Sequence, residues 1–349
     1  MQIHATNIHG LGASQVVISF LNACSKKGYI ESSKIFLPSI GFLSNYVPET
    51  GYIVRYKRRL PNGISRVFEC LFSRLFFSDE DTIVLGDIPL RGLYGQIVLV
   101  HQANLVYPRY NKFSSRAISF RLSRFLFSLN HRYASKIIVQ SGSMAKELIE
   151  SYPSIKDKVV ICCLPVPDWF LQDSLNRNIR KRKKKFSFFY PSAFYPHKMH
   201  IFLNSFYNYL IKNRIRFENV EILVTLSDKD FEPFSKIDFL RNVGNLSSTE
   251  MILYYNKVDA LLFLSSLESY GLPLIEAMSS NLPILTVDLP YSRWICEEHA
   301  YYFKPYEDES FFNALSKLRF DLNSGIHPDY SRPLTKIPKH WDSVLCEFF

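Results

Sequence analysis

Two glutamates, Glu268 and Glu276, stand eight positions apart and frame a stretch that contains a glycine and a proline. Residues 260–264 before them are all apolar, which predicts a buried strand. Pro273 suits the first turn of a helix, since its missing N–H would have no partner there in any case. The expected order is strand, loop and helix, with Glu268 on the loop and Glu276 about one turn into the helix.

The start of this expected helix has the chemistry of an anion site. Backbone N–H groups at a helix N-terminus point outward, and the helix dipole favours negative charge at that end. Three such groups lie between the glutamates, those of Gly271, Leu272 and Leu274. Two carboxylates beside an anion site suit a ligand with phosphates at one end and hydroxyls at the other. A nucleotide-sugar is such a ligand.

The composition limits the class of protein. The chain has 349 residues, of which 47% are hydrophobic, and this suits two domains with large cores. The formal net charge of +10 lies entirely in residues 1–164, which hold 20 Lys and Arg against 10 Asp and Glu. A basic half suggests an anionic partner such as a phospholipid surface or a phosphate-linked substrate, and solvated surface charge is the alternative.

Targeting and cysteine patterns predict a cytoplasmic protein. Residues 1–7 lack a charged segment followed by an apolar core, so no signal peptide is expected. No run of about 18 apolar residues is present, so no membrane-spanning helix is expected. The six cysteines have neither zinc nor redox spacing and are expected to be reduced thiols.

Short apolar runs alternate with helical patterns, which predicts an α/β fold with parallel sheets. The strands predicted in the first half are residues 3–6, 34–37, 53–56, 82–85, 97–101, 136–139 and 159–162, and the helices are residues 14–26, 66–77, 115–129 and 143–151. In the second half the strands are residues 186–190, 220–225, 260–264 and 283–287, and the helices are residues 200–212, 248–256 and 274–279. Ser143 is the expected N-cap of the helix that begins there.

This pattern predicts two domains and a C-terminal segment. Residues 1–165 are expected to form one Rossmann-like domain and residues 166–330 a second. Residues 331–349 are expected to end in a helix that packs back toward the first domain. Its apolar residues recur at helical spacing: Trp341, Val344, Leu345 and Phe348.

Three blocks of the chain resemble one known family. The block from Glu268 to Glu276 matches a pattern of Glu, seven residues and Glu. Residues 136–148 and residues 242–255 match the segments that end the first domain and precede the motif strand. On these blocks the chain resembles the family-four retaining glycosyltransferases, or glycosyl transferases group 1, of the type that builds bacterial surface polysaccharides. The resemblance implies the GT-B fold, with two Rossmann-like domains that face each other across a cleft.

The resemblance implies roles for the charged residues. Glu276 would accept hydrogen bonds from the ribose hydroxyls of a nucleotide-sugar donor, since an ionised carboxylate only accepts. Glu268 would face the donor sugar and the reacting carbon. Lys198 would lie against the donor diphosphate, where a fixed ammonium stabilises the leaving group. Many relatives carry an arginine about five residues before this lysine, whereas this chain has Ala193.

The remaining site residues come from loops. The resemblance places His101 at a strand end against the donor sugar or the acceptor, and a capped structural histidine is the alternative. Asp87 is a weaker candidate near the same edge. The other residues expected to bind the donor are Gly12, Leu246, Tyr270, Gly271 and Leu272.

Metal and nucleic acid are not expected partners. Asp228-Lys229-Asp230 is interpreted as a polar loop, and no other cluster has metal-ligand spacing, so we expect no metal cofactor. Residues 113–132 mix arginines with large apolar residues, and residues 57–59 add basic charge. A basic amphipathic helix can lie in a lipid headgroup layer, and a core-packed helix is the alternative. No nucleic-acid recognition motif accompanies the charge.

These observations predict a metal-independent retaining glycosyltransferase. It would move a hexose or deoxyhexose from a nucleotide-sugar to a lipid-linked oligosaccharide, as in O-antigen or capsule assembly, at the inner face of the plasma membrane. Two alternatives remain. One is a non-catalytic nucleotide-sugar-binding module, and the other is a sugar-nucleotide epimerase on the same fold.

Overall fold

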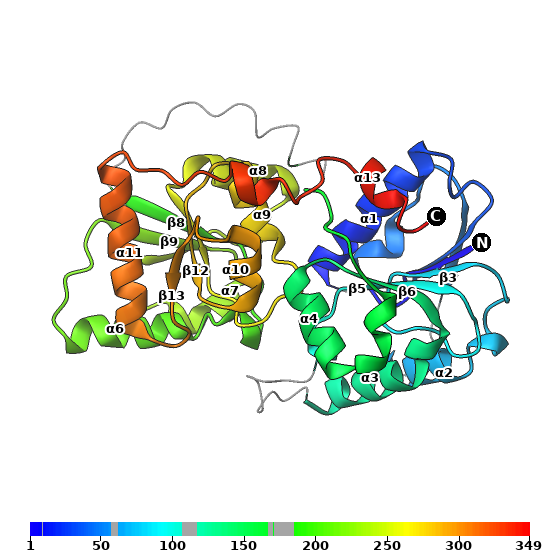
Figure 1. Cartoon of the computed structure of the whole chain (residues 1–349). Helices are drawn as coiled ribbons and strands as arrows, with labels where there is room; N and C mark the ends of the chain where they lie inside the picture. Colours follow the sequence, from blue (N-terminus) through cyan, green and yellow to red (C-terminus); the bar gives the residue numbers. More distant parts are fainter. Residues whose placement is uncertain (9, 57–61, 107–116, 167–169, 171–184) are drawn as a thin grey trace. The chain divides into compact units, whose positions relative to one another are not determined.

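The chain is described by a computed structural model that covers residues 1–8, 10–56, 62–106, 117–166, 170 and 185–349 (Figure 1). The predicted basic residues 57–59, and residues 113–116 of the basic segment, lie outside the described residues. The chain divides into two compact units. Unit 1 comprises Met1–Pro167 and Pro338–Phe349, and unit 2 comprises Asp168–Ile337.

Unit 1 is built on a parallel sheet of seven strands in the order β3-β2-β1-β4-β5-β6-β7. All seven strands predicted for this half are present, with ends that differ by one or two residues. Their bounds are β1 (Gln2–His4), β2 (Lys34–Pro38), β3 (Tyr52–Tyr56), β4 (Thr82–Val84), β5 (Gln96–Val100), β6 (Ala134–Val139) and β7 (Val159–Ile161). The strands are apolar because helices cover parallel sheets on both faces.

Helices α1 (Leu11–Lys26), α2 (Asn62–Leu71), α3 (Ala117–Asn130) and α4 (Gly142–Ser151) surround this sheet. One core joins α2, α3 and α4 to the strands, and it contains Cys70, Phe127, Leu148 and Val98. Figure 1 shows α1 above the sheet in the view and α2 and α3 below it. Short 3-10 turns complete the unit at Phe42–Asn45, Ser73–Leu75, Ala103–Leu105, His131–Tyr133 and Pro153–Lys158.

The C-terminal segment packs on α1 within unit 1. Its helix is a single turn, α13 (Asp342–Leu345), and the four residues of the predicted apolar stripe are all buried. The Trp341 indole Nε1 donates to Ser19 Oγ at 2.6 Å, and Lys27 pairs with Asp342 at 2.9 Å. Aromatic rings of Phe348 and Phe20 lie 4.8 Å apart.

Unit 2 has a parallel sheet of six strands in the order β10-β9-β8-β11-β12-β13. Its strands are β8 (Phe186–Tyr190), β9 (Val220–Val224), β10 (Leu240–Asn242), β11 (Ala260–Phe263), β12 (Ile284–Val287) and β13 (Tyr301–Phe303). In chain order this is 3-2-1-4-5-6, the strand order of a dinucleotide-binding Rossmann domain. The sequence prediction lacked β10 and β13.

The helices of unit 2 are α6 (Phe202–Lys212), α7 (Asp228–Phe231), α8 (Ser248–Lys257), α9 (Leu272–Ser279), α10 (Pro290–Cys296), α11 (Asp308–Asn323) and α12 (Ser331–Leu334), with 3-10 turns at Pro196–Lys198 and Glu232–Phe234. The start of α8 is fixed by a capping box between Ser247 and Glu250. In the part of the chain that is described, no helix is long and apolar enough to cross a membrane.

Three local predictions were wrong. The N-cap of α4 is Ser141, whose Oγ accepts from Met144 N, and not Ser143, which lies one residue inside the helix. Asp228–Phe231 forms the short helix α7 because Ser227 caps it, so this stretch is not a loop. The helix predicted over residues 66–77 begins earlier and ends at Leu71, and a 3-10 turn follows.

Candidate active site

The strand order of unit 2 reverses between β8 and β11, so the chain leaves these neighbouring strands in opposite directions. Loops at the carboxyl ends of such strands open a crevice in which Rossmann-type sheets bind ligands. The loop after β8 carries Lys198, and the loop after β11 carries Glu268. The topology alone therefore brings together two residues that are 70 positions apart in the sequence.

Hydrogen bonds tie these two loops to each other. The Ser266 backbone N–H donates to the His197 carbonyl at 2.7 Å, and the Ser266 hydroxyl reaches the same oxygen at 3.1 Å. The Tyr190 hydroxyl, buried at the end of β8, donates to the Lys198 carbonyl. These bonds fix the backbone on both sides of the two charged side chains.

Lys198 Nζ forms an ion pair with Glu268 Oε1. Both side chains keep some exposure, 17% for Lys198 and 15% for Glu268, so a ligand can reach them. The ammonium also lies 5.3 Å from the centre of the Phe263 ring at the end of β11. The arrangement presents one cation and one carboxylate from a mostly desolvated floor, where electrostatic interactions are stronger than in water.

Helix α9 starts at the same edge of the sheet. Its N-cap, Gly271, has φ 73°, a left-handed conformation that glycine adopts without strain. The Leu274 N–H donates to the Gly271 carbonyl at 2.9 Å, so it is not one of the free donors that the sequence suggested. The expected anion site is therefore smaller than predicted, and only Gly271 and Leu272 are left of the three amides.

Glu276 lies inside the unit, one turn into α9. Only 6% of its surface is exposed, and its Oε2 accepts a hydrogen bond of 2.6 Å from the Tyr255 hydroxyl on α8. Burial raises the pKa of Glu276 to about 7, while the bond from Tyr255 lowers it. Burial also raises the pKa of Tyr255 well above its ordinary value, so this hydroxyl remains a donor at neutral pH.

The other predicted donor-binding residues of unit 2 lie on loops or at a helix start at the same edge of the sheet. Tyr270 is buried directly before Gly271, and Leu272 is the first residue of α9. Leu246 is half-buried between β10 and the N-cap of α8. Their ligand-binding roles stay predictions.

In unit 1, His101 follows β5 at the carboxyl edge of the sheet. Asp87, with φ 71°, accepts from the His101 and Gln102 backbone N–H groups at 2.7 and 2.9 Å. His101 Nδ1 lies 3.0 Å from Gln140 Nε2, so Nδ1 accepts and the proton belongs on Nε2. Burial lowers the pKa of His101, and the Asp87 charge opposes this shift. A neutral ring with Nε2–H can donate to a hydroxyl or a phosphate oxygen.

Gly10 and Gly12 stand where α1 begins after β1. Gly10 is the N-cap, and Gly12 is already in the first helical turn rather than in a loop. A Cβ added at either position would meet no atom within 4 Å, so packing within the chain does not require these glycines. A ligand role for Gly12 stays a prediction.

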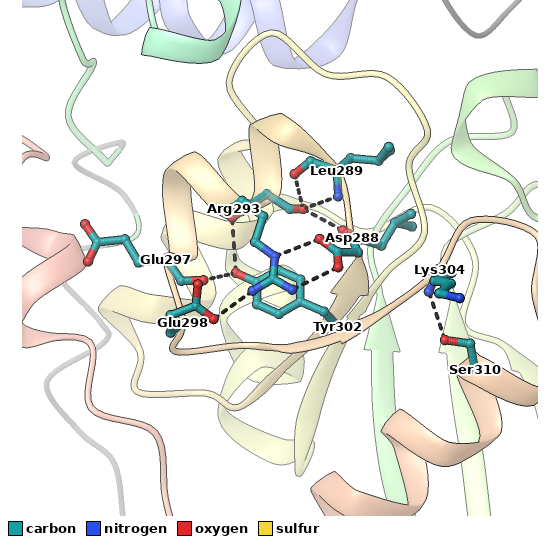
Figure 2. A network of polar contacts seen from close by, with 10 residues as sticks. Asp288, Leu289, Arg293, Glu297, Glu298, Tyr302, Lys304 and Ser310 are labelled. Atoms are coloured by element: carbon teal, nitrogen blue, oxygen red, sulfur yellow. Dashed lines mark hydrogen bonds and ion pairs between the residues drawn. The ribbon is translucent and has the colours of Figure 1, made fainter.

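A second charged cluster in unit 2 has a structural explanation (Figure 2). The Arg293 guanidinium makes two hydrogen bonds to Asp288, at 2.7 and 2.9 Å, and lies 3.7 Å from the centre of the Tyr302 ring. It also donates to Glu298 at 2.8 Å. Arg293 holds the pKa of Asp288 below its ordinary value. Both Asp288 oxygens are occupied, so this cluster fastens α10 to the end of β12.

Two surface hollows of about 450 and 540 Å³ lie along β13 and α11, lined in part by Lys317, Tyr302 and Asp321. None of the predicted site residues lines them, and the switch point between β8 and β11 is the better candidate because the Lys198–Glu268 ion pair lies there. Within the described ranges, no group of three or more His, Cys, Asp or Glu side chains is arranged to hold a metal ion.

The sequence is similar to one known family over much of unit 2. Residues 173–321, which include the switch-point loops and α9, match the family profile described as glycosyl transferases group 1. Over these residues the chain is similar to this family. The chain is 26% identical over 243 residues to the O-antigen chain mannosyltransferase RfbU of Salmonella typhimurium. That alignment covers 66% of this chain and 62% of RfbU, so the chain matches about three fifths of its relative.

The chain is also 42% identical over 59 residues to the serotype-specific mannosyltransferase WbdA of Escherichia coli. This shorter match covers 17% of this chain and 7% of WbdA. Solved structures show the fold. WaaG, a glycosyltransferase involved in lipopolysaccharide biosynthesis, aligns with a TM-score of 0.65 at 11% identity over 93% of this chain and 90% of WaaG. Sucrose-phosphate synthase of Thermosynechococcus elongatus aligns at 0.67 and 13% identity, over 99% and 96%.

HepE of Anabaena, solved in complex with UDP and glucose, aligns with a TM-score of 0.66 at 11% identity over 97% of this chain and 95% of HepE. The predicted fold class is therefore correct: the chain is an α/β protein with two parallel Rossmann-like sheets and the GT-B fold. Tyr255 is the site residue to which sequence reasoning assigned no role. It lies in a block that resembles the family, but its contact with Glu276 crosses 21 positions.

Proposed function

We propose that the protein is a retaining glycosyltransferase that moves a hexose from a nucleotide-sugar to a lipid-linked oligosaccharide during O-antigen or capsule assembly. The observation that carries the proposal is the Lys198–Glu268 ion pair at the switch point, in the same unit as the buried Glu276. The group 1 family match over residues 173–321 supports the reaction class. Mannose is the favoured sugar because RfbU and WbdA are both named mannosyltransferases.

Each part of such a donor has a chemically suited partner. An ionised Glu276 can accept bonds from two ribose hydroxyls, since a carboxylate offers several lone pairs. The Lys198 ammonium suits the diphosphate, as do the amides at the start of α9. The Glu268 carboxylate can accept hydrogen bonds from the sugar hydroxyls. UDP bound to the structural relative HepE supports a nucleoside diphosphate as the common ligand class.

Transfer breaks the bond between the anomeric carbon and the diphosphate oxygen, and forms a bond from that carbon to an acceptor hydroxyl on the same face. The acceptor proton passes to the departing phosphate oxygen, so no protein base is consumed. Charge grows on the leaving diphosphate, and Lys198 stabilises it there. Glu268 positions the sugar rather than attacking it, because its Oε1 is held by Lys198.

Unit 1 supplies the residue that we propose for binding the acceptor or the donor sugar. His101 is held by Gln140 at Nδ1 and by Asp87 at its backbone, so its Nε2–H keeps one orientation. A neutral imidazole that donates from a fixed position can select a hydroxyl of the correct geometry.

The proposal is tested with purified protein, a lipid-linked oligosaccharide and mannose donors that carry different nucleotide bases. We expect the acceptor to gain one hexose, and NMR of the product to show the anomeric configuration of the donor. Inverted product would overturn retention. Donor binding without transfer to any acceptor would instead support a binding module, and donor isomerisation without acceptor would support an epimerase.

A further inference from the structure

Two helices of unit 1 expose large apolar side chains to solvent. On α2 and directly after it these are Ile64, Phe68 and Phe72, and on α3 they are Ile118, Leu122 and Phe125. We call these six residues the α2–α3 patch. In each helix they recur every three or four positions, so they lie on one stripe. Ile118 is 80% exposed and Phe125 is 57% exposed, which is unusual for several large apolar groups on two neighbouring helices.

The two helices pack against each other, as Figure 1 shows at the lower edge of unit 1. Their opposite sides enter the core: Cys70 of α2 and Phe127 of α3 are buried there. Asn130, at the end of α3, donates to the Cys70 carbonyl at 2.9 Å and fixes the two helices side by side. The patch therefore lies on the solvent side of the packed helix pair and is not needed to fill the core.

The exposed charge on this helix pair is positive. Arg121 is exposed on α3 between the apolar residues of the stripe, and Arg132 is exposed just beyond its end. Among the described residues 62–78 and 117–133 the only acidic side chain is Glu69, and it is buried. Asp79, the first acid after α2 in the sequence, lies 3.8 Å from Arg74.

We infer that the α2–α3 patch docks on an anionic lipid surface. Aromatic and aliphatic residues would enter the boundary between headgroups and acyl chains, and the arginines would stay at the headgroup level. A second copy of the chain is a poorer occupant, because a two-fold interface brings the same surfaces together and sets arginines against arginines without acids. The role of this docking rests on the proposed function, because a lipid-linked acceptor is presented at such a surface.

The experiment measures co-sedimentation of the full chain with vesicles of phosphatidylglycerol and phosphatidylethanolamine, and with neutral phosphatidylcholine vesicles. The wild type should bind the anionic vesicles, and binding should fall as salt is raised. A triple variant, Ile118→Ser with Leu122→Ser and Phe125→Ser, should bind roughly tenfold or more weakly, since it removes three apolar anchors. Arg121→Gln should weaken binding about fivefold, in line with one cation near an anionic surface.

A matched control removes equally exposed apolar groups from unit 2: Ile211→Ser with Phe320→Ser and Ile326→Ser. The control should bind vesicles as the wild type does, and circular dichroism melts should show that both triple variants are folded. Equal binding by wild type and patch variant would overturn the inference. So would a wild type that binds no vesicle, or a patch variant whose only change is loss of a dimer in light scattering. No donor or acceptor is used, so failure here leaves the proposed transfer untouched.

Discussion

The Tyr255 hydroxyl on α8 donates to the Glu276 carboxylate on α9 across 2.6 Å, and both side chains are buried. This bond does two things for a carboxylate that must accept hydrogen bonds from a ligand. It occupies Oε2, which sets the direction in which the carboxylate points. It also lowers the pKa of Glu276 against the effect of burial, so more of the group is ionised at neutral pH.

Tyr255→Phe is expected to raise the donor KM about three- to tenfold at pH 7, the usual range for one lost hydrogen bond, with little change in kcat. Without the hydroxyl, the pKa of Glu276 should rise from about 7, so the KM defect should shrink as the pH is raised. The measurement is donor KM against pH for both proteins. Tyr254→Phe is the control, since Tyr254 is the next residue on α8 and its ring stacks on Phe189 at 5.4 Å. A defect of equal size at every pH would speak against this role.

Glu276→Gln should change how stability depends on pH. The pKa of Glu276 is about 7 in the folded chain and near 4.5 in the unfolded chain, so its contribution is fully present below pH 4.5. That contribution is lost as the pH rises through 7, because ionising the buried group then costs free energy. Between pH 4.5 and 7, the free energy of unfolding of the variant should therefore rise relative to that of the wild type. The total change should be on the order of 3 kcal/mol, at 1.36 kcal/mol per pKa unit. Urea titrations at several pH values would measure it, and a constant difference would contradict it.

The strand, loop and helix around Glu268 and Glu276 were predictable because the local signals agree. β11 is a continuous apolar run, Gly271 permits the left-handed turn, and Pro273 sits in the first helical turn. In contrast, β10 and β13 were not predicted. β10 reads Leu-Arg-Asn, with one apolar residue, and β13 reads Tyr-Tyr-Phe, with no aliphatic residue.

Contacts between residues far apart in the sequence were harder to predict. The Tyr255–Glu276 bond depends on how α8 packs against α9, and no local pattern encodes it. The Lys198–Glu268 pair was expected at one ligand site, but their direct contact follows from the adjacency of β8 and β11. The paired serines at positions 141 and 143 show the same limit, because either type suits an N-cap and only the backbone selects Ser141.

Gly12→Ala separates a structural role from a ligand role. Gly12 lies in the first turn of α1, where an added Cβ meets no atom within 4 Å, so alanine should stabilise the helix by about 0.5–1 kcal/mol. If a donor sugar or phosphate approaches this backbone, the same methyl group should lower transfer. A higher Tm together with reduced kcat/KM is the expected result. A higher Tm with unchanged kinetics would remove Gly12 from the site.

Metal removal tests the chemistry of the leaving group. We propose that Lys198 and the amides at the start of α9 carry the charge of the diphosphate, so transfer should proceed at an unchanged rate after treatment with EDTA. The check is the initial rate with and without chelator, followed by addition of Mg²⁺ or Mn²⁺. A rate that collapses with EDTA and recovers with either cation would show that the diphosphate needs a metal.

Lys198→Ala should lower turnover far more than donor affinity, because the ammonium acts most strongly on charge that develops as the diphosphate leaves. The expected loss of kcat is about 10²–10³-fold, as for removal of one preorganised donor. The variant also leaves Glu268 without its partner, so Lys198→Ala combined with Glu268→Gln should recover stability but not turnover. Lys229→Ala, which removes an exposed lysine from the same unit, is the matched control and should be neutral. Single-turnover rates decide the matter: if the double variant regains turnover, Lys198 serves to neutralise Glu268 rather than the leaving group.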